Sequence, residues 1–316
     1  NQLLAHYKIK DSFRYINVAL KMHMKLDKEA NKYSVLHRED LLIKDVSDYI
    51  EKHYYPAGYD AIKVLDENKK LLDQGIPVMV KVDMYHIPYS QYYHEKHNHH
   101  CIILCGYDET SVKIIDWYDW KYKGDIELET FLTARSSECE LDDSPYSGYP
   151  IRNEWTIVKP FDTEVSTKGC LKLTLDKTLH EYYETKENSV NDIYGLNTLR
   201  VIEDDAKKRI DDSEERQKAM LNSLRRTSIA MTSDLTLFCT YLSHINEELA
   251  MESINEVINA IKEDISAWRN FGLVMIKSSA LLSLKRYKTA LEKLHAMIEV
   301  EEARYHKLVE LKKQLA

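Results

Sequence analysis

The chain has 316 residues, and its 44 lysines and arginines against 52 aspartates and glutamates give a formal charge of −8 with neutral histidines. Because a nucleic-acid binder normally needs a basic face, this balance argues against general nucleic-acid binding. Hydrophobic residues make up 44% of the chain, which is enough for one or two cores and too much for a disordered protein. No segment approaches the roughly 18 consecutive apolar residues of a membrane span, and the N-terminal residues lack the pattern of a signal peptide. The sequence therefore predicts a globular protein that binds neither membranes nor nucleic acids.

The five cysteines are scattered along the chain without a Cys-x-x-Cys spacing. An odd number of dispersed cysteines is typical of free thiols in a reducing compartment. We therefore predict a cytoplasmic protein with neither a disulfide framework nor a zinc ribbon.

Three segments in the first half have the pattern of β-strands. Residues 78–83 alternate between apolar and other side chains, and residues 100–105 form a short apolar run. Residues 111–116 follow the polar turn 108–110, so the last two segments predict an antiparallel hairpin.

A hairpin centred on Asp108 would place His100 directly opposite Asp116. Directly opposed side chains have Cβ atoms about 4.5–5.5 Å apart, close enough for an imidazole and a carboxylate to form a hydrogen bond. The carboxylate would fix the imidazole tautomer, and the other ring nitrogen could then take a proton from a thiol or hydroxyl. A purely structural His–Asp hydrogen bond is the alternative, and a register slip of one residue would separate the pair.

Further histidines precede this pair, at positions 94, 97 and 99. Their spacing fits neither a His-Glu-x-x-His helix nor a simple alternating strand, and no carboxylate completes a ligand set by spacing alone. We therefore predict no metal site. The segment from Tyr85 to Tyr93 is rich in tyrosine, and Tyr89 and its neighbours could line a substrate groove or simply pack.

The second half has the pattern of long helices. All six prolines lie within the first 160 residues, and apolar residues recur every three or four positions from Leu221 onward. This period predicts three or more packed helices after a boundary near residues 160–190, with the charged tract 201–226 on a solvated helix. The last helix carries an apolar stripe that either packs within the chain or forms a homodimer: Leu294, Ile298, Tyr305, Leu308 and Leu315.

The segment from His100 to Tyr107, followed by Asp116 and Trp117, resembles the His and Asn/Asp strands of papain-like cysteine enzymes, including double-glycine leader peptidases. A longer stretch, residues 75–89 together with these strands, resembles the N-terminal domain of the butirosin biosynthesis protein H family. Residues 194–196 and 265–268 are similar to the second domain of that family.

The resemblance implies an α+β fold, with a papain-like domain and antiparallel sheet in residues 1–165 and an all-α helical bundle in residues 166–316. It also implies an acyltransferase of natural-product biosynthesis. A cysteine would take an aminoacyl or peptidyl group from the thioester of a carrier protein and pass it to an amine acceptor. The chain itself would bind no cofactor, since the phosphopantetheine belongs to the carrier protein.

The resemblance also assigns residues to roles. His100 would be the general base and Asp116 its orienting partner, while Asp83, Tyr85, Tyr89 and Trp117 would contact substrate. For Asp83, capping a turn at a strand end is an equally good explanation.

The nucleophile departs from the family pattern, because no cysteine precedes Cys101. Cys101 itself is predicted to point to the strand face opposite His100. We expect the nucleophilic cysteine to lie upstream of residue 1. The alternatives are a peptidase or amidase of the same fold and a non-catalytic protein that binds carrier proteins or acyl chains.

An acidic carrier protein would need a basic docking patch on this acidic chain. The candidates lie on the predicted helices: Arg225, Arg226, Lys277, Lys285, Arg286 and Lys288. The same side chains could instead cap helix ends or face solvent.

Overall fold

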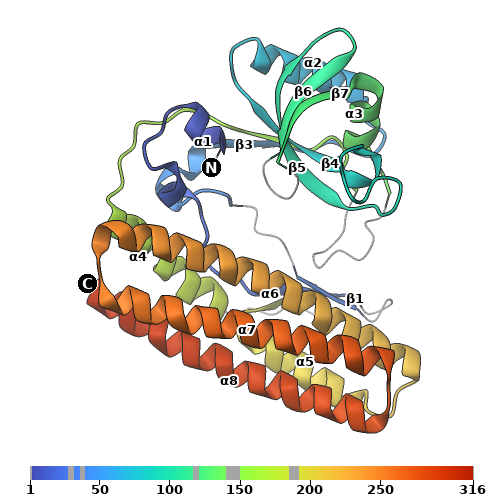
Figure 1. Cartoon of the computed structure of the whole chain (residues 1–316), viewed down its shortest axis with the longest axis vertical. Coiled ribbons are helices and arrows are strands. Elements are labelled where there is room, and N and C mark those ends of the chain that lie inside the picture. Colours follow the sequence, from blue (N-terminus) through green and yellow to red (C-terminus); the bar gives the residue numbers. More distant parts are fainter. Residues whose placement is uncertain are drawn as a thin grey trace. The chain divides into compact units, whose positions relative to one another are not determined.

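A computed structural model of the chain describes residues 2–27, 32–35, 40–116, 121–139, 150–184 and 192–315. The described residues form two compact units, which we call the sheet unit and the helical unit (Figure 1). The sheet unit lies within residues 1–10 and 47–162, and the helical unit within residues 11–46 and 163–316.

The sheet unit is built on a six-stranded antiparallel sheet with the strand order β3-β8-β4-β5-β6-β7. Its strands are β3 (Ile50–His53), β4 (Val78–Asp83), β5 (His99–Tyr107), β6 (Ser111–Asp116), β7 (Tyr122–Glu127) and β8 (Trp155–Val158). Its helices are α1 (Gln2–His6), α2 (Ala61–Leu72), the 3₁₀ helix η3 (Met84–His86) and α3 (Leu128–Arg135), while the 3₁₀ helix η2 (Lys44–Tyr49) leads into it.

The core of the sheet unit follows from the alternation that the sequence shows. Val78, Val80 and Val82 of β4 are fully buried because every second side chain of a strand points to the same face. They pack in one cluster with Val64 of α2 and Phe131 of α3, so both helices contribute to the core over this face. The apolar face therefore fixes which way each β4 and β5 side chain points, including those at the strand ends.

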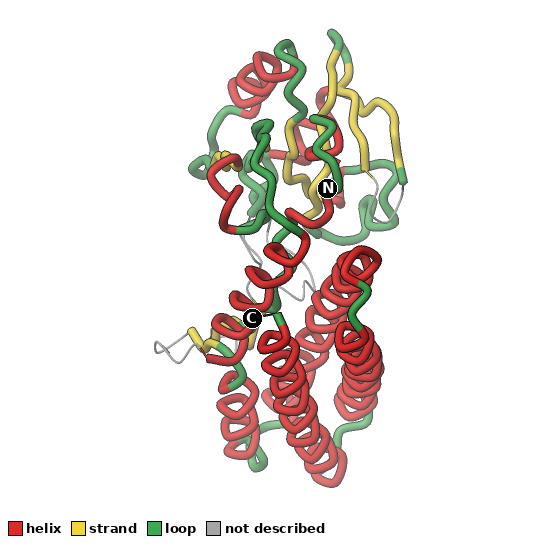
Figure 2. Tube along the Cα trace, turned by 90° about the vertical axis from the view of Figure 1, so that its left-hand side faces the viewer, coloured by secondary structure: helices red, strands yellow, loops and turns green. Residues whose placement is uncertain are grey.

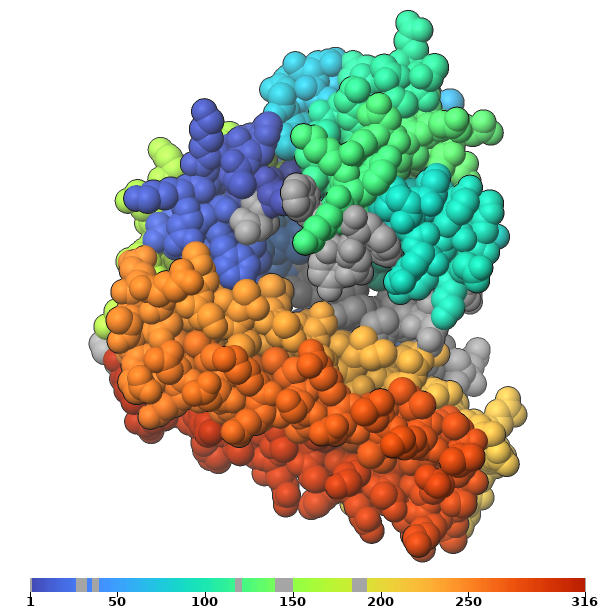
Figure 3. Space-filling view, viewed as in Figure 1, coloured from blue at the N-terminus to red at the C-terminus, as the bar shows by residue number. Residues whose placement is uncertain are grey.

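The helical unit consists mainly of three long helices, α6 (Glu214–Leu249), α7 (Glu252–Ala280) and α8 (Leu284–Gln314). They lie side by side (Figure 2), and their side chains form a continuous surface in the space-filling view (Figure 3). The remaining elements are η1 (Ser12–Tyr15), β1 (His23–Asp27), β2 (Lys32–Val35), α4 (Thr167–Thr178), the π-helical segment η4 (Leu179–Glu184), β9 (Asp192–Tyr194) and α5 (Asn197–Lys208). The strands form a small sheet in the order β2-β1-β9.

A buried polar network sits inside the helical unit. The Glu301 carboxylate accepts hydrogen bonds from Trp268 Nε1 at 2.7 Å and from two guanidinium nitrogens of Arg304 at 2.7 and 2.8 Å, and also from the Tyr182 hydroxyl. Arg304 Nε donates to Asp264 at 2.6 Å. Because a buried charge is costly unless it is paired and hydrogen-bonded, this network specifies how α7, α8 and η4 fit together.

The predicted α+β class, with an antiparallel sheet and a helical C-terminal region, is confirmed. The units differ from the predicted domains 1–165 and 166–316, because residues 11–46 pack with the helices. The helical part is therefore not all-α: Met22, Met24 and Val35, in and beside the small sheet, join its core. Among the described residues, no helix combines the length and apolar character needed to cross a membrane.

The apolar stripe of the last helix is explained by packing within the chain. Leu294, Ile298, Leu308 and Leu315 are buried in the core of the helical unit, and Tyr305 packs against it. The stripe is therefore not a free dimer surface.

Candidate functional site

The hairpin β5–β6 carries the predicted His–Asp pair, and a capped turn closes it. One carboxylate oxygen of Asp108 accepts hydrogen bonds from the backbone N–H groups of Thr110 and Ser111, both at 2.8 Å. These bonds, led by that from Thr110, lower the pKa of Asp108 to about 2. These hydrogen bonds fix the conformation of the turn, and the turn sets which residues of β5 and β6 pair next to it.

The register of the hairpin differs from the prediction by three residues next to the turn and by two residues beyond the bulge. Leu104 pairs with Ile114 and Ile103 with Ile115, and a β-bulge at Cys105 interrupts the ladder. Nearer the turn, Tyr107 pairs with Val112.

The bulge keeps the pair on one face. Without it, the pairing set at the turn would place Asp116 opposite Ile103, on the face away from His100. The bulge takes up one residue, so Asp116 instead falls opposite Ile102 when the observed register is extended by one pair. His100 and Asp116 then become diagonal neighbours, whose Cα atoms are about 7–8 Å apart and whose long side chains can still meet.

The imidazole and the carboxylate do meet: His100 Nε2 lies 3.0 Å from Asp116 Oδ1. The Asp116 side chain is 1% exposed and that of His100 is 16% exposed. An ionised carboxylate only accepts hydrogen bonds, so Nε2 donates and the neutral imidazole carries no proton on Nδ1. This arrangement makes Nδ1 the atom that can accept a proton from a reacting group.

Tyr89 holds the second oxygen of Asp116. Its hydroxyl donates to Oδ2 at 3.1 Å, and its ring stacks on Tyr122 of β7 with centroids 4.0 Å apart. Burial and the adjacent carboxylate raise the pKa of Tyr89, so the hydroxyl keeps its proton and stays a donor. The predicted substrate contact of Tyr89 stays a prediction, and the contact that the structure shows is this hydrogen bond to Asp116.

A second His–Asp pair lies at the end of β4. Asp83 is fully buried, and its Oδ2 contacts His97 Nδ1 and accepts a hydrogen bond from Ser137 Oγ, both at 2.7 Å. Its Oδ1 accepts from the backbone N–H groups of Tyr85 at 3.1 Å and Asn98 at 3.2 Å. The structure thus favours the turn-capping alternative for Asp83, because it caps η3 from inside the fold.

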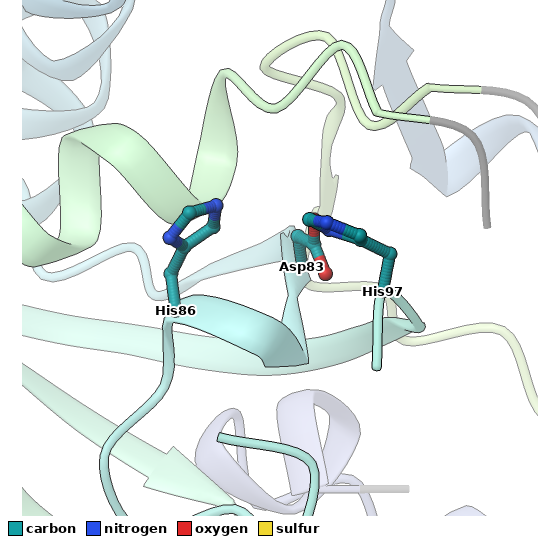
Figure 4. Close-up of side chains that lie close together, drawn as sticks. All are labelled: Asp83, His86 and His97. Atoms are coloured by element: carbon teal, nitrogen blue, oxygen red, sulfur yellow. The ribbon is translucent and has the colours of Figure 1, made fainter. Parts of the chain in front are cut away.

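Aromatic rings surround this second pair. Tyr85 stacks on His97 with centroids 4.3 Å apart and is 5.3 Å from His94. His86 of η3 stands on the other side of Asp83 from His97 (Figure 4), and burial lowers its pKa. One donor atom from each of Asp83, His86 and His97 can be chosen so that all three lie within 4.8 Å of one another.

The spacing of the histidines at positions 94 to 100 does not indicate this grouping. The structure brings His97 alone of that set together with both Asp83 and His86. The available signal was the Asp-x-x-His spacing at the end of a predicted strand. Of the other predicted site residues, Tyr85 contacts the second pair, and Trp117 lies outside the described residues.

The five cysteines occupy different environments. Cys101 is exposed, on the face of β5 opposite His100, and Cys105 forms the bulge and donates to Lys113 O at 3.4 Å. Cys139 is exposed beyond the end of α3. Cys170 and Cys239 are buried in the helical unit, and burial raises the pKa of Cys170 to about 11, which disfavours the thiolate.

Residues 12–117 match the family described as butirosin biosynthesis protein H, N-terminal. The predicted resemblance to this family is confirmed over these residues. The matched segment includes both His–Asp pairs, Tyr85 and Tyr89. A search of curated proteins finds no match to the chain.

Proposed function

We propose that the protein is a cysteine-dependent acyltransferase of natural-product biosynthesis, of the peptide or aminoglycoside type. It would move an aminoacyl or peptidyl group from a carrier-protein thioester to an amine. The observation that carries the proposal is the His100–Asp116 hydrogen bond inside a segment that matches the butirosin biosynthesis protein H family. The Asp116 carboxylate is buried and each of its oxygens accepts a hydrogen bond, so it can keep the imidazole of a general base oriented.

The chemistry would proceed in two balanced steps. In the first, His100 Nδ1 takes the thiol proton, the thiolate forms a bond to the thioester carbonyl carbon, and the pantetheine sulfur leaves with that proton. In the second, the amine attacks the acyl-enzyme, the carbon–sulfur bond to the enzyme breaks, and the amine proton passes through His100 to the released thiolate. Asp116 stabilises the imidazolium that each step creates.

The proposal requires a thiol within reach of His100. Cys101 faces away from it, and the buried thiols of the helical unit have raised pKa values. The acylation experiment below therefore has to identify which cysteine carries the acyl group.

We further propose that the carrier protein docks on the turn between α7 and α8. Lys277, Lys285, Arg286 and Lys288 are exposed there, beside Leu281 and Leu284, which are 61% and 55% exposed. Basic side chains around an apolar centre complement an acidic carrier protein. Arg225 and Arg226, the other two predicted residues, are partly buried on α6 and are weaker candidates.

The test is intact-protein mass spectrometry of the full-length gene product after incubation with an aminoacyl N-acetylcysteamine thioester. We expect a covalent acyl adduct on one cysteine, identified by peptide mapping, and at least a hundredfold slower acylation in His100→Ala. His99→Gln is the matched control, because His99 precedes His100 on the opposite face of β5. Absence of an adduct, or an adduct formed equally fast in His100→Ala, would reject the thiol mechanism and favour a binding protein.

Two further readouts sharpen the proposal. Product analysis with added amines separates acyl transfer from hydrolysis, since a peptidase or amidase would release the free acid. For docking, the double variant Lys285→Glu/Arg286→Glu should lower kcat/KM at least tenfold for a carrier-bound donor and leave the small thioester unaffected. An equal loss for both donors would show damage to the enzyme rather than to a docking surface.

A further inference from the structure

We propose that Asp83, His86 and His97 form a binding site for a divalent transition-metal ion of the zinc class. The three residues come from one short stretch of chain: the end of β4, the 3₁₀ helix η3 and the loop that returns to β5. This inference is independent of the acyltransferase proposal, because none of the three belongs to the His100–Asp116 pair.

The donor atoms are close enough to share one ion. They lie within 4.8 Å of one another, and the Nδ1 of His97 is 2.7 Å from the Oδ2 of Asp83. Tetrahedral ligands at about 2.0–2.2 Å from a common ion are roughly 3.3–3.6 Å apart. The His86 imidazole, which lies apart from the other two side chains in Figure 4, would have to move toward Asp83 to complete the site.

The groups around the donors hold them in place. Both backbone N–H bonds to Asp83 go to Oδ1, which leaves Oδ2 as the oxygen that faces His97. Ser137 Oγ bonds to the same Oδ2, and the Tyr85 ring stacks on His97 and sets its plane. Such supporting contacts are typical of metal sites, where outer partners orient the ligands.

The buried negative charge of Asp83 is a second reason to expect a bound cation. Its carboxylate is 0% exposed, and in the described part of the chain its recorded ion-pair partner is a histidine, with no lysine or arginine bound to it. A buried anion is costly unless a cation compensates it. A metal ion would supply that charge.

The ligand types select the ion. Two imidazoles and one carboxylate suit zinc, iron, cobalt or nickel better than calcium or magnesium, which prefer all-oxygen sites. Three protein ligands leave at least one coordination position for water. The ion would also tie η3 to the loop before β5 and so brace residues 84–98, the segment that carries Tyr89.

The test measures metal binding by the full chain after treatment with a chelator. Zinc binding is measured by competition with a chromophoric chelator, and cobalt binding by its visible absorption spectrum. We expect one equivalent of tightly bound zinc, a cobalt spectrum with nitrogen and oxygen ligation, and a thermal midpoint that rises with zinc. His86→Ala should weaken zinc binding at least a hundredfold, because it removes one of the three ligands. The variant should still fold, because the hydrogen bonds to Asp83 come from Tyr85, Asn98, His97 and Ser137.

Matched controls separate this site from scattered histidines and from the other pair. His94→Ala removes a neighbouring imidazole of the same loop outside the ligand set, and His100→Ala removes the proposed general base. Both variants should bind zinc as the parent does. The proposal is overturned if the parent binds no zinc at micromolar concentration, or if His86→Ala binds it as tightly as His94→Ala.

Discussion

The two His–Asp pairs of the sheet unit differ although their histidines are only three residues apart. His100 contacts Asp116 through Nε2, whereas His97 contacts Asp83 through Nδ1. By strand alternation, Asp83 points away from the face that carries Val82 and His100. Both carboxylates are buried, so burial alone does not distinguish them.

The partners of the two carboxylates do distinguish them. Asp116 receives side-chain donors from His100 and Tyr89, an arrangement that orients an imidazole. Asp83 receives two backbone donors and one hydroxyl in addition to His97, an arrangement that fastens a loop and fixes an anion. The role of a His–Asp contact therefore depends on the other groups that donate hydrogen bonds to the carboxylate.

The largest effect should come from Asp116→Asn. The amide keeps the shape of the side chain but no longer fixes the imidazole tautomer or stabilises the imidazolium, so acylation should slow by roughly 10²–10⁴-fold. Single-turnover acylation followed by quenched mass spectrometry measures this rate. Zinc binding should stay unchanged, and a parallel loss of zinc binding would show that the two pairs are not separate.

Removing the other carboxylate should mainly affect stability. Asp83→Ala leaves the buried backbone N–H groups of Tyr85 and Asn98 without their acceptor, together with Ser137 and His97. We expect a loss of about 3–5 kcal/mol in the free energy of unfolding, by analogy with other broken buried pairs. Denaturant titration of the metal-free protein measures it, and a loss below about 1 kcal/mol would contradict a structural role for this carboxylate.

A smaller effect is expected at Tyr89. Tyr89→Phe keeps the ring that stacks on Tyr122 and removes only the hydrogen bond to Asp116. A neutral donor to a charged acceptor contributes about 1–2 kcal/mol, so acylation should slow roughly five- to thirtyfold and the thermal midpoint should fall by a few degrees. An effect as large as that of His100→Ala would instead make Tyr89 a residue that contacts the reacting groups.

The sequence predicted the elements of the sheet unit better than their register. Alternation in residues 78–83 and 111–116 matches β4 and β6, because one face of each strand is buried. The register depends on the hydrogen bonds that Asp108 makes in the turn and on the bulge at Cys105, and neither changes the hydrophobic pattern. His100 and Asp116 still share one face because the register beside them is shifted by two residues, and an even shift keeps side chains on the same face.

The extent of the units was harder to predict for a different reason. Residues 11–46 carry apolar side chains such as Leu20 and Met22 whose packing partners, among them Leu171 and Leu175, come more than a hundred residues later. Nothing local in the sequence indicates which of two cores such a segment joins. The same limit applies to the grouping of Asp83, His86 and His97, since the loop that brings His97 back to Asp83 has no periodic pattern.

The smallest effect on acylation is expected from deletion of Cys105. Because Cys105 is the extra residue of the bulge, its removal leaves Leu104 opposite Ile114 and Ile103 opposite Ile115. His100 and Asp116 therefore keep their face and their hydrogen bond, and acylation should stay within about threefold of the parent. Acylation rates and circular dichroism measure the outcome, with Cys105→Ser as the control for loss of the thiol. A folded deletion variant that is as slow as His100→Ala would contradict this expectation. It would show that the backbone shape of the bulge is itself needed at the site.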